Sequence, residues 1–362
     1  MILAGDIGGT KTNLALYDWR DGRVEPIRTD TFYSADYARL EDVIAEFLDP
    51  PQPEPIEETE QSASDESGNE PSKDAPAAAA PKEPLVIDAA CFGVAGPVID
   101  NRCQTTNLPW VISGADLATT FKIPHVRLLN DLEATAHGLL LLRTDEIVTL
   151  NAGTPPKSRR CLALIAAGTG LGEAILVWTG QRYQPFASEG GHCDFAPNSD
   201  LEIELLRYLR GQFVHVSYER VVSGPGLMTI YEFLRDTKKN EPTWLAEKIR
   251  AGDGPAVISE AGLTGQADIA KQALELFASI YGAEAGNLAL KAMSLDGIYL
   301  GGGIAPKLLK KLQDGTFMRG FTNKGRYKRL MSSIPVRVIT NQHTALLGAA
   351  SMASQLARGA TT

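Results

Sequence analysis

The sequence predicts an α/β fold made of two similar halves with a cleft between them. Each half begins with an apolar strand that runs into a glycine-rich turn, GDIGGTK at residues 5–11 and AAGTGLG at residues 166–172. Strand and helix patterns alternate after each turn, and a pattern that occurs twice indicates duplication of one α/β unit. The chain of 362 residues is long enough for two such lobes. Ligands commonly bind where two lobes meet, so we expect the functional site in the cleft.

The first half is predicted to begin with three strands and to continue with alternating helices and strands. Residues 36–48 should form an amphipathic helix, because apolar residues recur there at helical spacing. Ser113 is a good helix cap and predicts a short helix to Phe121. The other elements expected here are strands at 2–7, 12–19, 24–32, 85–94 and 126–129 and a helix at 131–142.

The second half repeats this order and adds a largely helical region. Ser199 and Glu202 have the form of a capping box, which predicts a helix that ends near Gly211. The remaining expected elements are strands at 162–167, 173–178, 298–300 and 336–339 and helices at 226–236, 242–250, 267–293, from about Pro306, and at 344–356. We expect residues 1–141 and 342–362 to form a small lobe and residues 142–341 a large one.

Residues 49–84 interrupt the first half with a segment of low complexity. They contain ten acidic residues, two lysines and eight prolines, and Ile56 is their single large aliphatic residue. Such a segment buries too little apolar surface to offset its ordering entropy, so we expect a disordered insertion. A docking segment for a partner is the alternative.

Charge and composition exclude several classes of protein. The insertion carries −8 of the net charge of −9, and the rest shows no basic face, so we expect no nucleic-acid partner. The sequence has no apolar run of about 18 residues and no basic, apolar leader, which predicts neither a membrane span nor a signal peptide. Its four cysteines form no CxxC pair, as is usual in a reducing compartment. We therefore expect a cytoplasmic protein.

The first glycine turn resembles a phosphate-binding P-loop but lacks its pattern. Thr10 stands where the P-loop needs its second glycine, and residues 13–19 alternate like a strand instead of a helix. We predict a hairpin in which Gly8 and Gly9 let backbone N–H groups approach a ligand closely. Asp6 would suit a neighbouring phosphate if it held Mg²⁺ through water. An ordinary tight hairpin remains the alternative.

Two further turns strengthen the ligand-binding interpretation. Residues 168–170 repeat the strand–turn–strand pattern with an embedded threonine, and GGGIAP at 301–306 joins a strand to a helix, where glycines would let a purine lie against the backbone. In this order the three turns resemble the phosphate-1, phosphate-2 and adenosine motifs of the sugar kinase, heat-shock protein and actin superfamily. The resemblance implies two RNase H-like lobes, as in actin-like ATPases, with ATP in the cleft. The ATP-binding residues that it implies are Asp6, Ile7, Gly8, Gly9, Thr10, Lys11, Gly168, Thr169, Gly170, Gly302 and Gly303.

Asp131 follows a predicted strand and begins a predicted helix. Polar side chains at the carboxyl ends of strands often build the sites of α/β proteins, and a helix N-terminus favours an ionised carboxylate. Such a carboxylate can accept the proton of an attacking hydroxyl group. An ordinary helix cap is the alternative.

Two more polar groups lie in the second half. Glu189 and His192 are three residues apart with flexible glycines between them, which suits two side chains that converge on a polyol. A surface turn explains the same residues, and a zinc site would need more ligands. Glu219 can accept hydrogen bonds from a sugar, although such a residue is commonly solvated or paired with arginine.

Taken together, these motifs closely resemble bacterial glucokinases in order and context. The matching stretches are FGVAGPV at 92–98, TNLPW at 106–110, LND at 129–131, EGGHCDFAP at 189–197, SYER at 217–220 and ERVVSGPGL at 219–227. The resemblance covers nearly the whole chain outside residues 49–84. Lys11 is shared with the related ROK kinases, but the cysteine-rich zinc motif of those proteins does not follow His192.

The resemblance implies ATP-dependent phosphorylation of D-glucose to glucose 6-phosphate, which enters glycolysis, with Mg²⁺ bound through the phosphates. It implies that Asp131 is the general base and that sugar hydroxyls are held by Asn130, Glu189, His192 and Glu219, with Asn107 nearby. We also expect a homodimer. A kinase for another hexose and a non-catalytic sugar sensor on the same fold are the alternatives.

A deletion tests the role of the insertion. Replacing residues 50–84 by a short Gly-Ser linker should leave kcat within about twofold of the full chain, because exposed insertions of this composition tolerate removal. The rate is measured as ADP release with glucose and ATP. A large loss of kcat in a variant that melts like the full chain would show that the segment takes part in catalysis.

Overall fold

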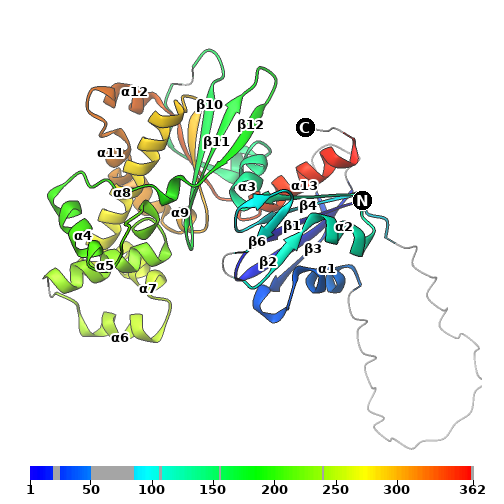
Figure 1. The fold of residues 1–362 in the computed structure, drawn as a ribbon. Coiled ribbons are helices and arrows are strands. Elements are labelled where there is room, and N and C mark those ends of the chain that lie inside the picture. The colour runs from blue at the N-terminus through cyan, green and yellow to red at the C-terminus, as the bar shows by residue number, and fades with distance from the viewer. Residues whose placement is uncertain (19–24, 50–84, 106–107, 155, 239, 360–362) are drawn as a thin grey trace, which may run out of the picture.

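The computed structural model describes residues 1–18, 25–49, 85–105, 108–154, 156–238 and 240–359. Apart from Asp49, the residues of the insertion lie outside the described part, so its predicted disorder stays a prediction. Thr106 and Asn107 also lie outside the described part. Figure 1 shows the described elements in two halves, each built around its own sheet.

The first sheet has five strands in the order β3-β2-β1-β4-β8. Strands β1, β2 and β3 are antiparallel neighbours, whereas β4 and β8 run parallel to β1. Their bounds are β1 Ile2–Ile7, β2 Lys11–Tyr17, β3 Pro26–Tyr33, β4 Ala89–Val94 and β8 His125–Asn130. A separate small sheet consists of β5 Val98–Ile99, β6 Arg102–Gln104 and β7 Val111–Ser113.

Four helices belong to this half of the described chain: α1 Leu40–Leu48, α2 Gly114–Phe121, α3 Asp131–Leu139 and the C-terminal α13 Thr344–Ala357. Helix α13 packs on α3, β1 and β4, so the end of the chain returns to the first sheet (Figure 1). Gly138 and Gly348 allow these two helices to approach closely, since a Cβ on Gly348 would collide with the Ala134 carbonyl. The predicted lobe boundaries at residues 141 and 342 are compatible with this packing and stay a prediction.

The second sheet has the order β12-β11-β10-β13-β14-β9. Its strands are β9 Ile147–Asn151, β10 Cys161–Ala167, β11 Leu171–Trp178, β12 Tyr183–Ser188, β13 Gly297–Gly301 and β14 Val336–Ile339. Strands β10, β11 and β12 are antiparallel neighbours, and β13 and β14 run parallel to β10. The strands β12-β11-β10-β13-β14 therefore repeat the order and directions of the five strands of the first sheet. The predicted α/β fold with a duplicated unit is confirmed.

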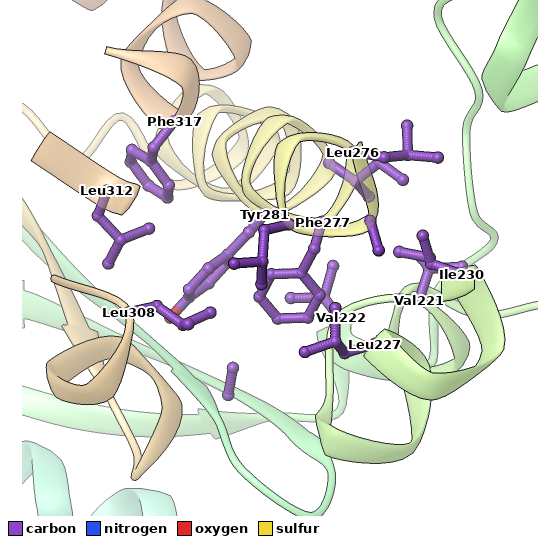
Figure 2. Close-up of a cluster of buried hydrophobic side chains, with 14 of the residues drawn as sticks. Val221, Val222, Leu227, Ile230, Leu276, Phe277, Tyr281, Leu308, Leu312 and Phe317 are labelled. Carbon is purple, nitrogen blue, oxygen red and sulfur yellow. The ribbon is translucent and has the colours of Figure 1, made fainter. Parts of the chain in front are cut away.

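The long helix α8, Asp268–Ala292, is the centre of the second half. The other helices of this half are α4 Asp200–Arg210, α5 Gly224–Lys238, α6 Thr243–Ala251, α7 Gly254–Leu263, α9 Ile304–Lys307, α10 Leu309–Gln313, α11 Thr316–Thr322 and α12 Lys328–Ser333. Of these, α5, α7, α10 and α11 pack against α8. Figure 2 shows Phe277 and Tyr281 of α8 among apolar side chains of neighbouring segments, such as Leu227 and Leu308. The buried hydroxyl of Tyr281 donates to the Ile165 carbonyl at 3.3 Å, which ties this core to β10.

Several boundaries differ from the predictions for local reasons. The first helix begins at Leu40 instead of residue 36, because Ser34–Asp36 form a 3-10 turn and Arg39 is extended. The strand predicted from residue 85 begins at Ala89, and the helix predicted to end at 142 ends at Leu139. Helix α7 was missed because its largely apolar sequence lacks a polar face. In the part of the chain that the structure describes, no helix is both long and apolar enough to cross a membrane.

Candidate active site

Three chain segments leave the first sheet at one edge. Ile7, Val94 and Asn130 are in register across the parallel strands β1, β4 and β8. The first glycine turn follows Ile7, and Asp131 follows Asn130, so both lie at the carboxyl ends of neighbouring parallel strands. The charges of Asp6 and Asp131 are close enough to interact.

The first glycine turn is a hairpin, as predicted, because antiparallel β1 and β2 pair Ile7 with Thr12. The Gly8 N–H donates to the Lys11 carbonyl at 2.9 Å. Ser34, which the sequence analysis missed, donates its hydroxyl to the Gly8 carbonyl at 2.9 Å and its N–H to the Thr10 carbonyl at 3.0 Å. These bonds fix the turn, while Thr10 is exposed.

Asp6 lies at the end of β1 with its carboxyl partly enclosed. Asn13 of β2 donates its amide N–H to Asp6 Oδ2 at 3.5 Å. Burial raises the pKa of Asp6 above its ordinary value, although the Asn13 hydrogen bond and the charge of His343 oppose the shift. Neither Asn13 nor His343 carried a motif that would have marked it in the sequence.

Asp131 is the first residue of α3, and Asn130 caps that helix. Asn130 accepts the Leu132 N–H at 2.9 Å and donates its own amide to the Gly96 carbonyl at 3.1 Å. The Leu132 N–H also reaches Asp131 Oδ1 at 2.8 Å. The strand–helix junction predicted at this position is confirmed.

The prediction that the helix N-terminus would favour an ionised Asp131 gives the wrong net direction. Burial raises the pKa of Asp131 to about 6, and the charges of Asp6 and Glu189 raise it further against the opposing Leu132 hydrogen bond. Desolvation of a carboxylate therefore outweighs the helix terminus here. The group is mostly ionised at neutral pH and is a stronger base than an ordinary aspartate.

The second and third glycine turns lie side by side at one edge of the second sheet. Ala166 of β10 pairs with Gly301 of β13 in parallel register. Gly302 has φ +77°, and a Cβ on it would collide with the Ala167 carbonyl. Only glycine therefore allows this close approach. Gly168 and Gly303 are open, since a Cβ on either would meet no atom within 4 Å.

Glu219 is attached to the second glycine turn. It lies in the 3-10 turn Tyr218–Arg220 and accepts the Leu171 N–H at 3.0 Å through Oε2. A Cβ on Gly170 would lie 2.5 Å from the same oxygen. The Gly224 N–H donates to the Gly168 carbonyl at 2.8 Å. The segment that follows Glu219 is thus fastened to the turn at 168–170.

Glu189 immediately precedes the 3-10 turn Gly190–His192, and His192 is the last residue of that turn. Their Oε2 and Nε2 atoms are 4.0 Å apart, and the side chains are 73% and 59% exposed. The glycines between them are buried, and a Cβ on Gly191 would collide with the Leu171 carbonyl. The prediction of a flexible glycine pair was wrong, because these glycines permit tight packing on β11.

One contact joins the two groups of turns. The Leu132 side chain occupies the space that a Cβ on Gly172 would need. Leu132 follows Asp131, and Gly172 is the last residue of the second glycine-rich segment at 166–172, so Asp131 lies where the halves meet. The charge of Glu189 acts on Asp131 at the same place. Asn107, which was also expected near the site, lies outside the described residues.

The sequence and fold agree with one family over almost the full length. The glucokinase family model matches residues 3–356. This chain belongs to the glucokinase family. A glucokinase of Synechocystis sp. is 42% identical over 370 residues, which cover 98% of each chain. The resemblance drawn from the motifs is therefore confirmed.

Solved structures support the same assignment. The crystal structure of a glucokinase from an Antarctic psychrotroph has a TM-score of 0.75 and 28% identity and covers 97% of this chain and 98% of that one. A ROK family glucokinase from Streptomyces griseus, solved with glucose and AMPPNP, has a TM-score of 0.61 and 21% identity and covers 98% and 99% of the two chains. At that identity it shows the fold alone. The predicted actin-like architecture of two α/β lobes is confirmed.

The raised pKa of Asp131 predicts a pH-dependent gain in stability on substitution. Asp131→Asn should increase the free energy of unfolding by about 1–3 kcal/mol above pH 7, because the wild-type chain must bury a charge there. The gain should decline as the pH falls below about 6 and should disappear below about pH 3, where the carboxyl is protonated in both states. Thermal melts across this pH range measure it.

Asp145→Asn provides the control for this measurement. The Asp145 side chain is 74% exposed, so its substitution should give no such pH-dependent gain. An Asp131→Asn variant whose melting temperature followed the wild-type value at every pH would contradict the buried, charged state.

Proposed function

We propose that this chain transfers the γ-phosphoryl group of ATP to the 6-hydroxyl of D-glucose, with Asp131 as general base. The observation that carries the proposal is the half-buried carboxyl of Asp131 at the junction of the two halves, in a chain of the glucokinase family. The product, glucose 6-phosphate, enters glycolysis. We place the reaction in the cytoplasm and expect a homodimer.

A weak base is sufficient for the role proposed for Asp131. Phosphoryl transfer passes through a loose transition state, so the attacking hydroxyl needs correct position more than strong deprotonation. A carboxylate with a pKa of about 6 can accept that proton as the new P–O bond forms. The Leu132 N–H donates to the Asp131 carboxyl, and the Asn130 cap fixes the start of α3, which keeps the proposed base oriented.

The three glycine turns are proposed to hold ATP. The Gly8 and Gly168 N–H groups donate within their own turns. The N–H groups of Gly9 and Thr10 and those of Thr169 and Gly170 would therefore contact the phosphates, and Gly302 and Gly303 would lie beside the adenosine. The ATP-binding set also includes Asp6, Ile7, Gly8, Lys11 and Gly168. The open sides of Gly168 and Gly303 leave room for a ligand. AMPPNP in the Streptomyces griseus structure is consistent with a nucleotide site on this fold.

Mg²⁺ is proposed to accompany ATP. The carboxyls of Asp6 and Asp131 lie close enough for their charges to interact, and hard oxygen donors of this kind suit Mg²⁺. Within the described residues, no three side chains with His, Cys, Asp or Glu donors gather to hold a metal directly. We therefore propose that Asp6 holds the ion through water, where it would neutralise phosphate charge.

The sugar hydroxyls are proposed to contact Asn130, Glu189, His192 and Glu219. Glu189 and His192 are exposed and lie close together, so both can turn toward a polyol. Glu219 keeps one oxygen on the Leu171 N–H, which orients its carboxylate beside the second glycine turn. A kinase for a different hexose is the main alternative, because these groups can bind several sugars.

A substrate panel tests the proposed reaction. We expect glucose with ATP to give the highest kcat/KM among glucose, mannose, fructose and N-acetylhexosamines, with ATP and polyphosphate compared as donors. ADP release is measured by a coupled assay. A higher kcat/KM for another hexose would assign a different substrate, and sugar binding without turnover would indicate a sensor.

Asp131→Ala is the matched variant for the chemical step. Loss of the general base should lower kcat by about 10²-fold or more while ATP binding persists. Phosphorylation within about tenfold of the wild-type rate would reject this role for Asp131.

The contact between Gly170 and Glu219 gives a second, independent prediction. Gly170→Ala should displace the Glu219 carboxylate and raise the KM for glucose by about tenfold, because the sugar would lose a fixed acceptor. Gly168→Ala is the comparison variant in the same turn: its Cβ would meet no protein atom within 4 Å, so it should leave the KM for glucose unchanged and can alter only the KM for ATP. An unchanged KM for glucose in Gly170→Ala would show that Glu219 does not bind the sugar.

A further inference from the structure

Two buried glutamates meet beneath the proposed sugar-binding turns. Glu173 lies on β11 and is 2% exposed, and Glu284 lies on α8 and is fully buried. Each has an oxygen, Oε1, that is buried and lacks a hydrogen-bond partner among the described residues. Burial and the charge of Glu284 raise the pKa of Glu173 to about 8. Two adjacent buried charges would be strongly destabilising, so the pair should retain a proton at neutral pH.

The surroundings of the pair assign that proton to Glu173. Glu284 Oε2 accepts the Asn287 amide at 2.8 Å, and Lys291 Nζ lies 3.6 Å from Glu284 Oε1. The Tyr218 hydroxyl, which accepts a second Asn287 N–H at 2.9 Å, also interacts with Glu284. Donors and a cation therefore favour a carboxylate at Glu284. A protonated Glu173 can donate to it.

The other charged or titratable groups around the pair do not replace this proton. Tyr281 of α8 donates its hydroxyl to the Ile165 carbonyl. Lys324, which follows α11, donates to the Asn287 side-chain oxygen at 2.6 Å and to the Ala283 carbonyl at 2.8 Å. Both groups are thus engaged elsewhere.

The pair supports both sugar-binding turns from below. A Cβ on Gly190 would collide with Glu173 Oε2, so the Gly190–His192 turn rests directly on this carboxyl. Tyr218, which interacts with Glu284, immediately precedes Glu219 in the 3-10 turn Tyr218–Arg220. The Tyr218 N–H donates to the Cys193 carbonyl at 3.0 Å and connects the two turns.

We propose that Glu173 and Glu284 share one proton and that this shared proton positions Glu189, His192 and Glu219 for sugar binding. The proposal rests on the function proposed above. Glu173 is a positioning residue, because it acts through the turns and does not touch the sugar. Deprotonation of Glu173 releases its proton to solvent and leaves two carboxylates facing each other. Their repulsion displaces Glu173 against Gly190, and the turn above it must move.

The pH dependence of glucose binding tests this arrangement. In the wild-type chain the KM for glucose should rise about tenfold between about pH 7.5 and pH 9.5, because the binding-competent state carries the proton. Glu173→Gln mimics the protonated acid, so its KM should stay within about twofold of the wild-type value at pH 7 and remain flat to pH 9.5. Glu284→Gln replaces the shared proton by an amide N–H and should also give a flat profile.

Calorimetric titration with glucose alone supplies a readout that does not depend on turnover. The dissociation constant should follow the same pH profile as the KM in each variant. Glu260→Gln is the control, because Glu260 is 59% exposed on α7 and should leave the wild-type profile unchanged. Thermal melts identify a variant that fails to fold, in which case the other glutamine variant decides.

Three outcomes separate the hypotheses. A wild-type profile that stays flat to pH 9.5 overturns the shared proton. An equal rise in wild type and in both glutamine variants also overturns it, since the titrating group would then lie elsewhere. Glucose binding with the predicted profile but without phosphorylation would leave the shared proton intact and reject the proposed kinase reaction.

Discussion

The contact between Leu132 and Gly172 is the constraint on which the site depends. It seats the start of α3, from the first sheet, against β11 of the second. Asp131 precedes Leu132, so this apolar contact fixes where the carboxylate lies relative to the second glycine turn. A Cβ on Gly172 would collide with the Leu132 side chain, which would then have to shift next to Asp131.

Electrostatic strain is concentrated around that junction. Asp6, Asp131 and Glu189 bring negative charge together, and the proposed ATP adds more. The charged carboxylates of Asp6 and Asp131 oppose folding, because burial removes part of their hydration. The same strain suits the proposed catalysis, since it raises the pKa of Asp131 to about 6. The buried pair below differs, because a retained proton relieves its repulsion.

Local patterns in the sequence predicted much of this arrangement. The alternation after Lys11 separated a hairpin from a P-loop, and the strand–helix junction at Asn130 located the proposed general base, Asp131. Strand register, and with it the proximity of Asp6 to Asp131, depends on long-range pairing that no local pattern encodes. The sequence placed Glu173 at the start of a strand without indicating its surroundings, and only the folded structure shows that it is buried.

The glycines illustrate the same limit. Their presence in turns was evident, but their physical roles differ by position. Gly302 adopts a left-handed conformation against the Ala167 carbonyl, whereas Gly190 and Gly191 give way to neighbouring atoms. The sequence shows only that glycine occupies these positions. The atoms around each glycine explain why a larger residue would not fit.

The return of α13 to the first sheet has a consequence for folding. Ile2, Ala4 and Cys91 pack in one cluster with Leu346 and Met352, which lie far from them along the sequence. One apolar face of the first sheet is therefore covered only through contacts of high sequence separation. Contacts of this kind form slowly, so this face is open to aggregation until α13 has docked.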